Sequence, residues 1–259
     1  VPMLRKLGCR IVWLGCMNWL HKQERRLLGL YGDWADAYVC QSDYQREVLT
    51  RQAGQITQTD LNRWHLIRGA FDLGQFPYRP KLRNSDEPLV WGRLARPDGD
   101  KWPPDLWRLG QRLPAYAQRA RVMAWTPALI NVCGIPPAWA ETLAPMQEPA
   151  AQFVQSLHAL LCFAAPQTVE NWPRVGLEAM ASGTPIIAER RGGWCEMIKH
   201  GETGLLADSI DEAAELLAEL WHDEALRVRL SRNAVDAVMR WADPAAFLDG
   251  WEAVLNSMR

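Results

Sequence analysis

The sequence of 259 residues has no apolar run long enough to cross a membrane as a helix. Its longest apolar runs, residues 11–16 and 159–166, fall far short of the ~20 residues that a spanning helix needs. The net charge is only −1, which argues against bulk binding of nucleic acid, so we expect no nucleic-acid partner. Hydrophobic residues make up 48% and charged residues 23%, which excludes a wholly disordered or collagen-like chain.

Cysteines are few and none forms a closely spaced pair. The spacing excludes the C-x-x-C pattern of zinc and redox sites. Cys40 and Cys162 lie in apolar stretches, where cysteine behaves as a small core residue. We therefore expect reduced thiols and a cytoplasmic protein, either free or peripheral at the inner face of the membrane. The six cysteines stand at positions 9, 16, 40, 133, 162 and 195.

The weak net charge hides an uneven distribution along the chain. Residues 1–80 hold 11 Lys+Arg and 7 Asp+Glu, a net of +4, while residues 81–259 hold 18 and 23, a net of −5. A mildly basic first third is compatible with contact to anionic lipid or an anionic acceptor. Ordinary solvated charge explains the same distribution, so peripheral membrane contact is one of two interpretations.

Apolar runs typical of strands alternate with amphipathic stretches along most of the chain. This alternation predicts an α/β protein whose parallel sheet has helices on both faces. The Pro-rich residues 126–149 remain unassigned. Strands are expected at residues 10–16, 37–41, 65–70, 88–92, 121–125, 158–164, 185–188 and 204–207. Helices are expected at residues 21–30, 42–51 with a Ser42–Gln45 capping box, from 103, at 153–157, 173–182 and 194–199, and from 210 onward.

A linker divides the predicted elements. Residues 72–87 contain two prolines, one glycine and many charges. We place the linker proper at residues 76–87, between an N-terminal domain over 1–75 and a second domain over 88–240. A C-terminal helix is expected over residues 241–259.

Two carboxylates surround the start of the helix predicted after strand 158–164. Glu170 lies in the loop at the carboxyl end of that strand, and Glu178 lies inside the helix. Arg174 precedes Glu178 by one turn, so the two share a helix face. A helix N-terminus suits a phosphate, whereas carboxylates accept hydrogen bonds from neutral hydroxyls. The arrangement fits a ligand with hydroxyls on both sides of a diphosphate, as in a nucleotide-sugar.

The same segment resembles a known family. Glu170 and Glu178, with seven residues between them and followed by AMASGTPII, resemble the E-x7-E signature of GT-B-fold retaining glycosyltransferases of family 4. The GGWCEMI and GETGLL blocks, residues 192–198 and 201–206, resemble the block that follows in that family. Upstream, GRL with Lys101 and RGAFD at residues 68–72 resemble its basic block and interdomain segment. The similarity covers most of residues 36–256.

The resemblance implies a GT-B-like fold and a reaction. Residues 88–240 become a Rossmann-like donor domain with a parallel sheet, and residues 1–75 a partial Rossmann-like acceptor-side domain. The reaction is sugar transfer from a nucleotide-diphosphate sugar with retained configuration, without metal or other cofactor. The acceptor is a glycan, a lipid-linked compound or a small molecule. Glu170 is expected to hold sugar hydroxyls, Glu178 ribose hydroxyls, and Arg93 and Lys101 the diphosphate charge.

The chain departs from the family pattern at the helix start. Trp172-Pro173 stands where many members have glycine, and Pro173 has no N–H to offer a phosphate. Our hypothesis is that Arg174 compensates. Arg96 rivals Lys101, because the segment between Arg93 and Lys101 is longer than the usual form. The donor-side candidates besides Glu178 are therefore Arg174, Trp172, Val175 and Arg96.

Several alternatives stay open at this point. The carboxylates and cations can be ordinary surface charges, and His21 is either an acceptor-side histidine or a surface residue. Trp172 and Trp194 are candidates for sugar stacking. The N-terminal part lacks the family's first strand and Gly-rich loop, which indicates a fragment, a minimal acceptor domain, or completion by a partner. The competing functions are a non-catalytic nucleotide-sugar-binding module and a GT-B-fold epimerase or phosphorylase.

Overall fold

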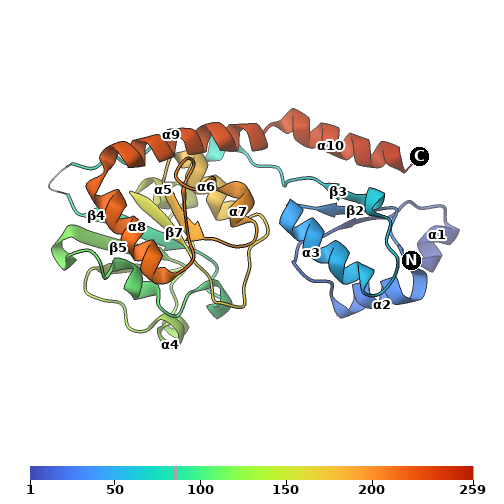
Figure 1. Ribbon diagram of the computed structural model, residues 1–259, viewed down its shortest axis with the longest axis horizontal. Helices are drawn as coiled ribbons and strands as arrows, with labels where there is room; N and C mark the ends of the chain where they lie inside the picture. The colour runs from blue at the N-terminus through green and yellow to red at the C-terminus, as the bar shows by residue number, and fades with distance from the viewer. Residues whose placement is uncertain (85–86, 259) are drawn as a thin grey trace. The chain divides into compact units, whose positions relative to one another are not determined.

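The computed structural model describes residues 1–84 and 87–258, and it divides the chain into two compact units (Figure 1). Unit 1 consists of Val1–Ala70, Glu170–Trp172 and Ala242–Arg259, and unit 2 of Phe71–Val169 and Pro173–Trp241. Residues 85 and 86 of the predicted linker and residue 259 of the predicted C-terminal helix lie outside the described residues. The predicted domain boundaries stay predictions.

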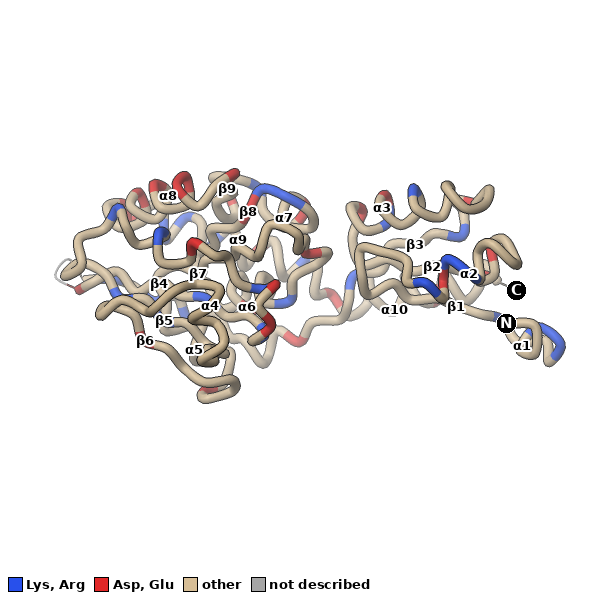
Figure 2. Tube along the Cα trace, turned by 90° about the horizontal axis from the view of Figure 1, so that it is seen from below, with Lys and Arg blue, Asp and Glu red and all other residues tan. Residues whose placement is uncertain are grey.

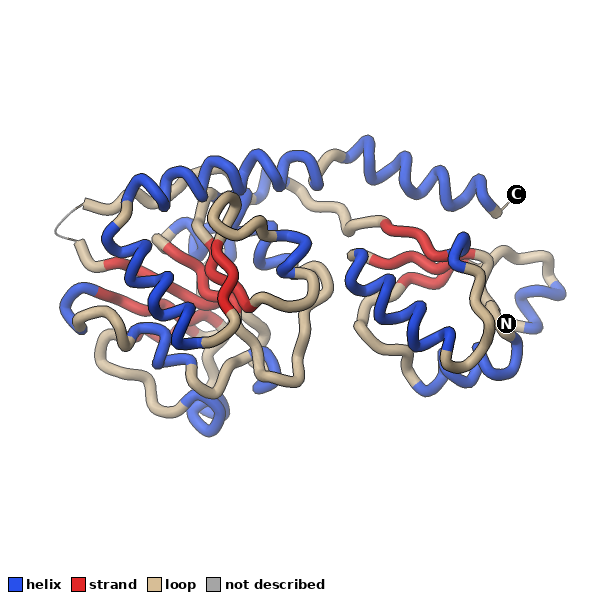
Figure 3. The backbone as a smooth tube through the Cα atoms, in the orientation of Figure 1, coloured by secondary structure: helices blue, strands red, loops and turns tan. Residues whose placement is uncertain are grey.

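Unit 1 is built on a small parallel sheet. The strands β1 (Val12–Leu14), β2 (Ala37–Cys40) and β3 (Trp64–Leu66) pair in the order β1-β2-β3 (Figure 3). All three predicted strands of this part are confirmed, although each is shorter than its apolar run. Short helical segments flank them at α1 (Pro2–Lys6) and η1 (Leu61–Arg63).

Helices cover both faces of the unit 1 sheet. The helices α2 (Lys22–Tyr31) and α3 (Asp43–Gly54) pack on one face, where the rings of Tyr38 and Trp64 stack with centroids 4.4 Å apart. The C-terminal helix α10 (Pro244–Ser257) packs on the other face, where Val254 joins Val39 and Ile67 in one apolar cluster. The last helix of the chain therefore completes the core of the first unit.

The start of α3 corrects part of the predicted capping box. Ser42 is the N-cap, and its hydroxyl accepts a hydrogen bond from the Gln45 backbone N–H at 3.0 Å, as expected. The reciprocal bond of a capping box would join the Ser42 N–H to the Gln45 side chain, and Gln45 does not make it. Its side-chain oxygen instead accepts from the Gln41 N–H at 2.7 Å. Its amide nitrogen donates to the Met17 carbonyl at 3.0 Å. The buried Gln45 side chain thus ties the β1–α2 loop to the end of β2.

Unit 2 contains a six-stranded parallel sheet in the order β6-β5-β4-β7-β8-β9. The strand β6 falls inside the unassigned Pro-rich stretch, and the other five strands were predicted. The order in the sheet reverses between β4 and β7, and parallel sheets bind ligands beyond the carboxyl ends of the strands at such a switch point. The strands are β4 (Leu89–Leu94), β5 (Gln118–Met123), β6 (Ala140–Leu143), β7 (Ala159–Cys162), β8 (Ile186–Glu189) and β9 (Leu205–Ala207).

One face of this sheet carries a large apolar cluster. Trp91, Leu161 and Ile187 point to this face and meet the 3-10 helix η4 (Leu106–Gly110) and α8 (Ile210–His222). The predicted α-helix after Pro103 is therefore wrong in type, because only this short 3-10 helix forms. Figure 2 shows several acidic positions along α8, and one of them, Asp211, pairs with Arg108 of η4 at 2.5 Å.

Further helices of unit 2 surround its sheet. The helix α6 packs against β8, α5 and α9. Their bounds are α5 (Ala150–Gln155), α6 (Arg174–Ser182), α7 (Trp194–Met197) and α9 (Glu224–Trp241). Shorter segments are η2 (Leu73–Gln75), η3 (Gly99–Lys101), η5 (Ala115–Ala117), η6 (Pro127–Leu129) and α4 (Ile130–Cys133).

Candidate functional site

The first turns of α6 hold the predicted carboxylate and its cationic neighbour. The Glu178 side chain is only 13% exposed, and its Oε1 lies 3.4 Å from the Arg174 Nε, so the predicted shared face is confirmed. Burial raises the pKa of Glu178, and the Arg174 charge opposes that shift. A carboxylate offers about four acceptor positions. This ion pair therefore leaves Glu178 able to accept hydrogen bonds from ligand hydroxyls.

The local sequence fixes how α6 begins and what it packs against. Pro173 is the N-cap rather than the first helical residue, which corrects the prediction, and Val175 is half-buried in the first turn. A Cβ on Gly176 would stand 2.4 Å from the Met197 Sδ, so only glycine allows α6 to approach α7 this closely. Trp194 is 2% exposed against the same glycine, so the expected sugar-stacking role of Trp194 is wrong.

Arg93 lies near the carboxyl end of β4, beside the switch point. It is 5% exposed, and its Nη1 donates to the Leu161 carbonyl of β7 at 3.1 Å. Its Nη2 donates to the Lys101 carbonyl, and its guanidinium lies 5.6 Å from the centroid of the Trp102 ring. Arg93 therefore joins β4, β7 and η3, and its contact with a diphosphate stays a prediction.

The loop after β4 brings the other two predicted cations to this edge. Lys101 ends η3, and its carbonyl is the one that Arg93 binds. Arg96 is exposed, and its Nη1 lies 3.3 Å from the Asp98 carboxylate. The η3 turn also contacts the loop after β7, because the Ala165 N–H donates to the Asp100 carbonyl at 3.1 Å. Arg93 and Lys101 are thus neighbours through the backbone.

Sequence reasoning missed two charged residues at the end of β8. The Glu189 side chain is 6% exposed, and its Oε2 accepts from the Arg191 Nη2 at 2.6 Å. Burial raises the pKa of Glu189, while Arg191 and then the nearby Arg93 oppose the shift. Both residues line a cavity of about 290 Å³ together with Ala164 and Pro166. The run Glu-Arg-Arg directly after an apolar strand was the available signal.

The remaining predicted residues belong to unit 1. Trp172 is 9% exposed, and the Arg68 guanidinium lies 4.5 Å above its ring, so one ring face already stacks on a cation. Glu170 is half-buried in the same three-residue segment. His21 is the exposed N-cap of α2, and its backbone N–H donates to the Glu24 carboxylate at 2.6 Å. Its acceptor-side role stays a prediction.

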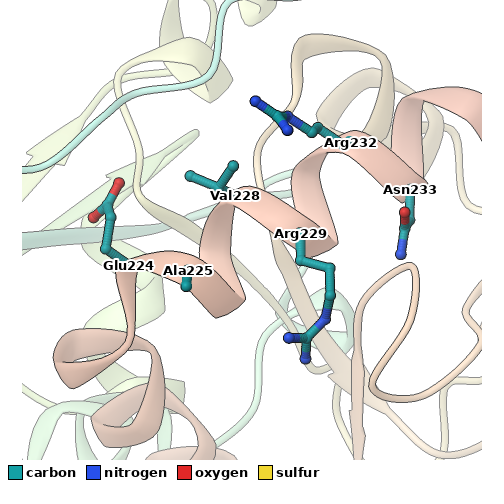
Figure 4. Close-up of a pocket in the computed structure, with 6 residues that line it drawn as sticks. All are labelled: Glu224, Ala225, Val228, Arg229, Arg232 and Asn233. Carbon is teal, nitrogen blue, oxygen red and sulfur yellow. The ribbon is translucent and has the colours of Figure 1, made fainter.

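A second hollow, about 660 Å³ in volume, lies on the outer side of α9 (Figure 4). No strand end lines it, and Arg229 and Arg232 leave the helix in different directions. The residues that line it all belong to α9, so the larger volume of this hollow does not make it the candidate site.

Within residues 1–84 and 87–258, no three His, Cys, Asp or Glu side chains gather as a potential metal site. Across the same residues, no helix combines the length and apolarity needed to cross a bilayer.

Solved structures identify the class of fold. The Anabaena protein Alr3699/HepE, crystallised in complex with UDP and glucose, matches with a TM-score of 0.79 at 17% identity. The match covers 98% of this chain and 73% of that chain. The fold is therefore α/β of the GT-B glycosyltransferase type, as predicted.

A family model and curated relatives narrow that class. Residues 145–236 match the family described as Glycosyl transferases group 1. The D-inositol 3-phosphate glycosyltransferase of Corynebacterium efficiens is 38% identical over 104 residues, which are 39% of this chain and 24% of that protein. The GDP-mannose-dependent alpha-(1-6)-phosphatidylinositol monomannoside mannosyltransferase of Mycobacterium tuberculosis is 37% identical over 107 residues, 39% of this chain and 28% of that protein.

These matches show what one part of the chain is similar to. The segment of residues 145–236 is similar to a group 1 glycosyltransferase domain, and it includes β7, α6 and β8 with Glu170 and Glu178. The chain spans about a quarter of the length of the curated relatives that it matches.

Proposed function

We propose that this chain binds a nucleotide-diphosphate sugar and transfers the sugar to an acceptor hydroxyl. The observation that carries the proposal is Glu178, a carboxylate only 13% exposed and one turn into α6, within the segment that matches group 1 glycosyl transferases. The helix start suits phosphate, and the carboxylate suits ribose hydroxyls. The strand order supports the same location, because the switch point lies between β4 and β7.

In this proposal each remaining candidate has one task. Glu170 holds hydroxyls of the transferred sugar, and Arg93 with Lys101 neutralises the charge that grows on the departing diphosphate. Because two cations perform that task, the reaction needs no divalent metal. The configuration at the anomeric carbon is retained, and Glu170 and Glu178 form the E-x7-E signature of a family 4-like enzyme.

The nucleotide and the acceptor are the open parts of the proposal. The Anabaena protein binds UDP, while one relative is named for GDP-mannose, so both bases are candidates. The names of the curated relatives make inositol phosphate and phosphatidylinositol the first acceptors to test. We propose a reducing, cytoplasmic location, since all six cysteines are free thiols. Peripheral contact at the inner membrane face is a separate part of the proposal, supported by the net charge of +4 over residues 1–80.

Calorimetric titration of the full chain with UDP-glucose and GDP-mannose, followed by product analysis, tests this proposal. Binding and sugar transfer to D-inositol 3-phosphate or another hydroxyl acceptor, with retained configuration, are expected. Binding without transfer or hydrolysis indicates the non-catalytic module instead. Release of sugar 1-phosphate with inorganic phosphate, or inversion at another sugar carbon, indicates the phosphorylase or the epimerase.

A further inference from the structure

One arginine of the loop after β8, Arg191, makes hydrogen bonds to the loop after β7. The Arg191 Nη1 donates to the Pro166 carbonyl at 2.6 Å, and its Nη2 donates to the Ala165 carbonyl at 3.1 Å. Its Nη2 also donates to the Glu189 carboxylate, whose Oε2 accepts from the Ala164 N–H at 3.4 Å. A single side chain and its carboxylate partner therefore hold three consecutive residues of the β7–α6 loop.

The gripped residues also bind the turn that carries Lys101. The Ala165 N–H donates to the Asp100 carbonyl, and the Thr168 hydroxyl donates to the Asp100 carboxylate at 3.4 Å. The next carbonyl along the chain, that of Lys101, accepts from Arg93. A continuous set of hydrogen bonds thus runs from the end of β8 through the β7–α6 loop to η3 and the end of β4.

The neighbouring Arg190 takes no part in this set. Its Nε lies 3.2 Å from the Asp208 carboxylate, and its Nη2 donates to the Leu206 carbonyl at 2.8 Å. Both contacts lie at the end of β9, on the other side of β8 from β7. The two adjacent arginines have the same charge but hold different loops.

We propose that Arg191, anchored by Glu189, is a positioning residue for the diphosphate-binding edge formed by Arg93 and Lys101. The inference rests on the proposed function. A planar guanidinium can donate in two directions at once, which lets Arg191 hold two carbonyls and one carboxylate. The buried Glu189 carboxylate fixes the position of the Arg191 guanidinium. This position in turn holds Ala165 at hydrogen-bonding distance from Asp100. Misplacement of a binding group by about 1 Å far from the chemistry can lower the rate 10²-fold.

The test compares three variants of the full chain: Arg191→Ala, Arg191→Lys and the matched control Arg190→Ala. UDP and GDP affinity is measured by calorimetry, and kcat and KM by hydrolysis or transfer of UDP-glucose and GDP-mannose. Arg191→Ala should lower kcat/KM about 10- to 100-fold, mainly through kcat. Arg191→Lys should recover thermal stability but not kcat, because an ammonium group does not donate in the fixed, planar directions of a guanidinium. Arg190→Ala should stay within about twofold of wild type.

Two outcomes overturn the inference. In one, Arg191→Ala melts earlier but its folded fraction keeps wild-type kcat and KM, which is a purely structural role. In the other, Arg190→Ala loses as much activity as Arg191→Ala. If Arg191→Ala does not fold, Glu189→Gln, which keeps an acceptor without the charge, should show a smaller loss in the same direction.

A readout independent of activity separates this inference from the proposed function. Amide hydrogen exchange at Ala165 and Thr168 should accelerate in Arg191→Ala and not in Arg190→Ala. Unchanged exchange contradicts the grip itself. A wild-type chain that neither binds nor turns over any nucleotide-sugar contradicts the proposed function, even where the exchange result holds.

Discussion

Replacement of Glu178 by glutamine separates a binding role from a structural one. Burial raises the pKa of Glu178 above the ordinary 4.5 of a glutamic acid. The folded chain therefore binds the proton more tightly than the unfolded chain, and stability falls as the pH rises through the folded-state pKa. Glu178→Gln removes that penalty, so its free energy of unfolding at pH 7 should equal or slightly exceed that of wild type. The partner Arg174 is 65% exposed and stays solvated.

The expected loss of affinity follows from the hydrogen bonds that a carboxylate makes to ribose. Hydrogen bonds to a charged group contribute about 1.5–3 kcal/mol, which corresponds to roughly 10- to 150-fold in affinity. Glutamine keeps one acceptor and loses the charge, so we expect a loss near the lower end, about tenfold. Glu178→Gln should therefore lower the affinity for the nucleotide while leaving the free energy of unfolding unchanged or slightly higher.

Calorimetry with a nucleotide and its 2′-deoxy form measures this effect. The nucleotide is whichever of UDP and GDP wild type binds more tightly. The deoxynucleotide should bind wild type about tenfold more weakly, whereas Glu178→Gln should bind the two forms with similar affinity. Glu141→Gln on β6, whose side chain is 53% exposed, is the control and should match wild type. Equal affinities of wild type and Glu178→Gln for the nucleotide would refute the ribose assignment.

Three further predictions concern packing, pH and charge. Gly176→Ala should lower the free energy of unfolding by about 1–3 kcal/mol, because the added Cβ would clash with Met197. The control Gly29→Ala in α2 places its Cβ at an ordinary contact distance and should be neutral or stabilising. Thermal unfolding of the two variants measures the difference. Burial lowers the pKa of His158 to about 4 from 6.5, so acidification from pH 6.5 to 4 should remove about 3 kcal/mol of stability in urea titrations, and His158→Asn should remove most of that pH dependence. Arg93→Ala should lower kcat about 10²–10³-fold, and wild-type turnover should persist in EDTA; turnover abolished by EDTA contradicts metal independence.

The strands with dense apolar runs could be predicted from the sequence, and the exceptions have physical reasons. Residues of β7 and β8 are buried on both sides, so their runs are continuous and readily recognised. The edge strand β6 reads Ala-Glu-Thr-Leu with two exposed positions, which leaves neither an apolar run nor a clear alternation. The η4 segment carries the apolar spacing of a helix, but it ends at Gly110, where the buried Gln118 side chain leaves no room for a Cβ.

The candidate site was predictable where one helix or one strand end positions the residues. The spacing of Arg174 and Glu178 fixed their shared face, because three or four residues make one helical turn. The contacts of Arg93 depend on the carbonyls of Leu161 and Lys101, which come from other parts of the chain. The grip of Arg191 on the β7–α6 loop depends in the same way on strand order. Such contacts require the tertiary structure, and periodicity does not contain them.

Binding of a nucleoside diphosphate by the full chain is the most direct measurement of the central claim. Thermal unfolding is followed with UDP, GDP and ADP and with their sugars. A ligand at 100 times its dissociation constant should raise the free energy of unfolding by about 2.7 kcal/mol. The proposed function predicts this shift for at least one nucleotide, and a shift of about 1.4 kcal/mol for the Glu178→Gln variant at the same concentration, because its affinity is about tenfold lower. An unchanged unfolding curve with every nucleotide would contradict it.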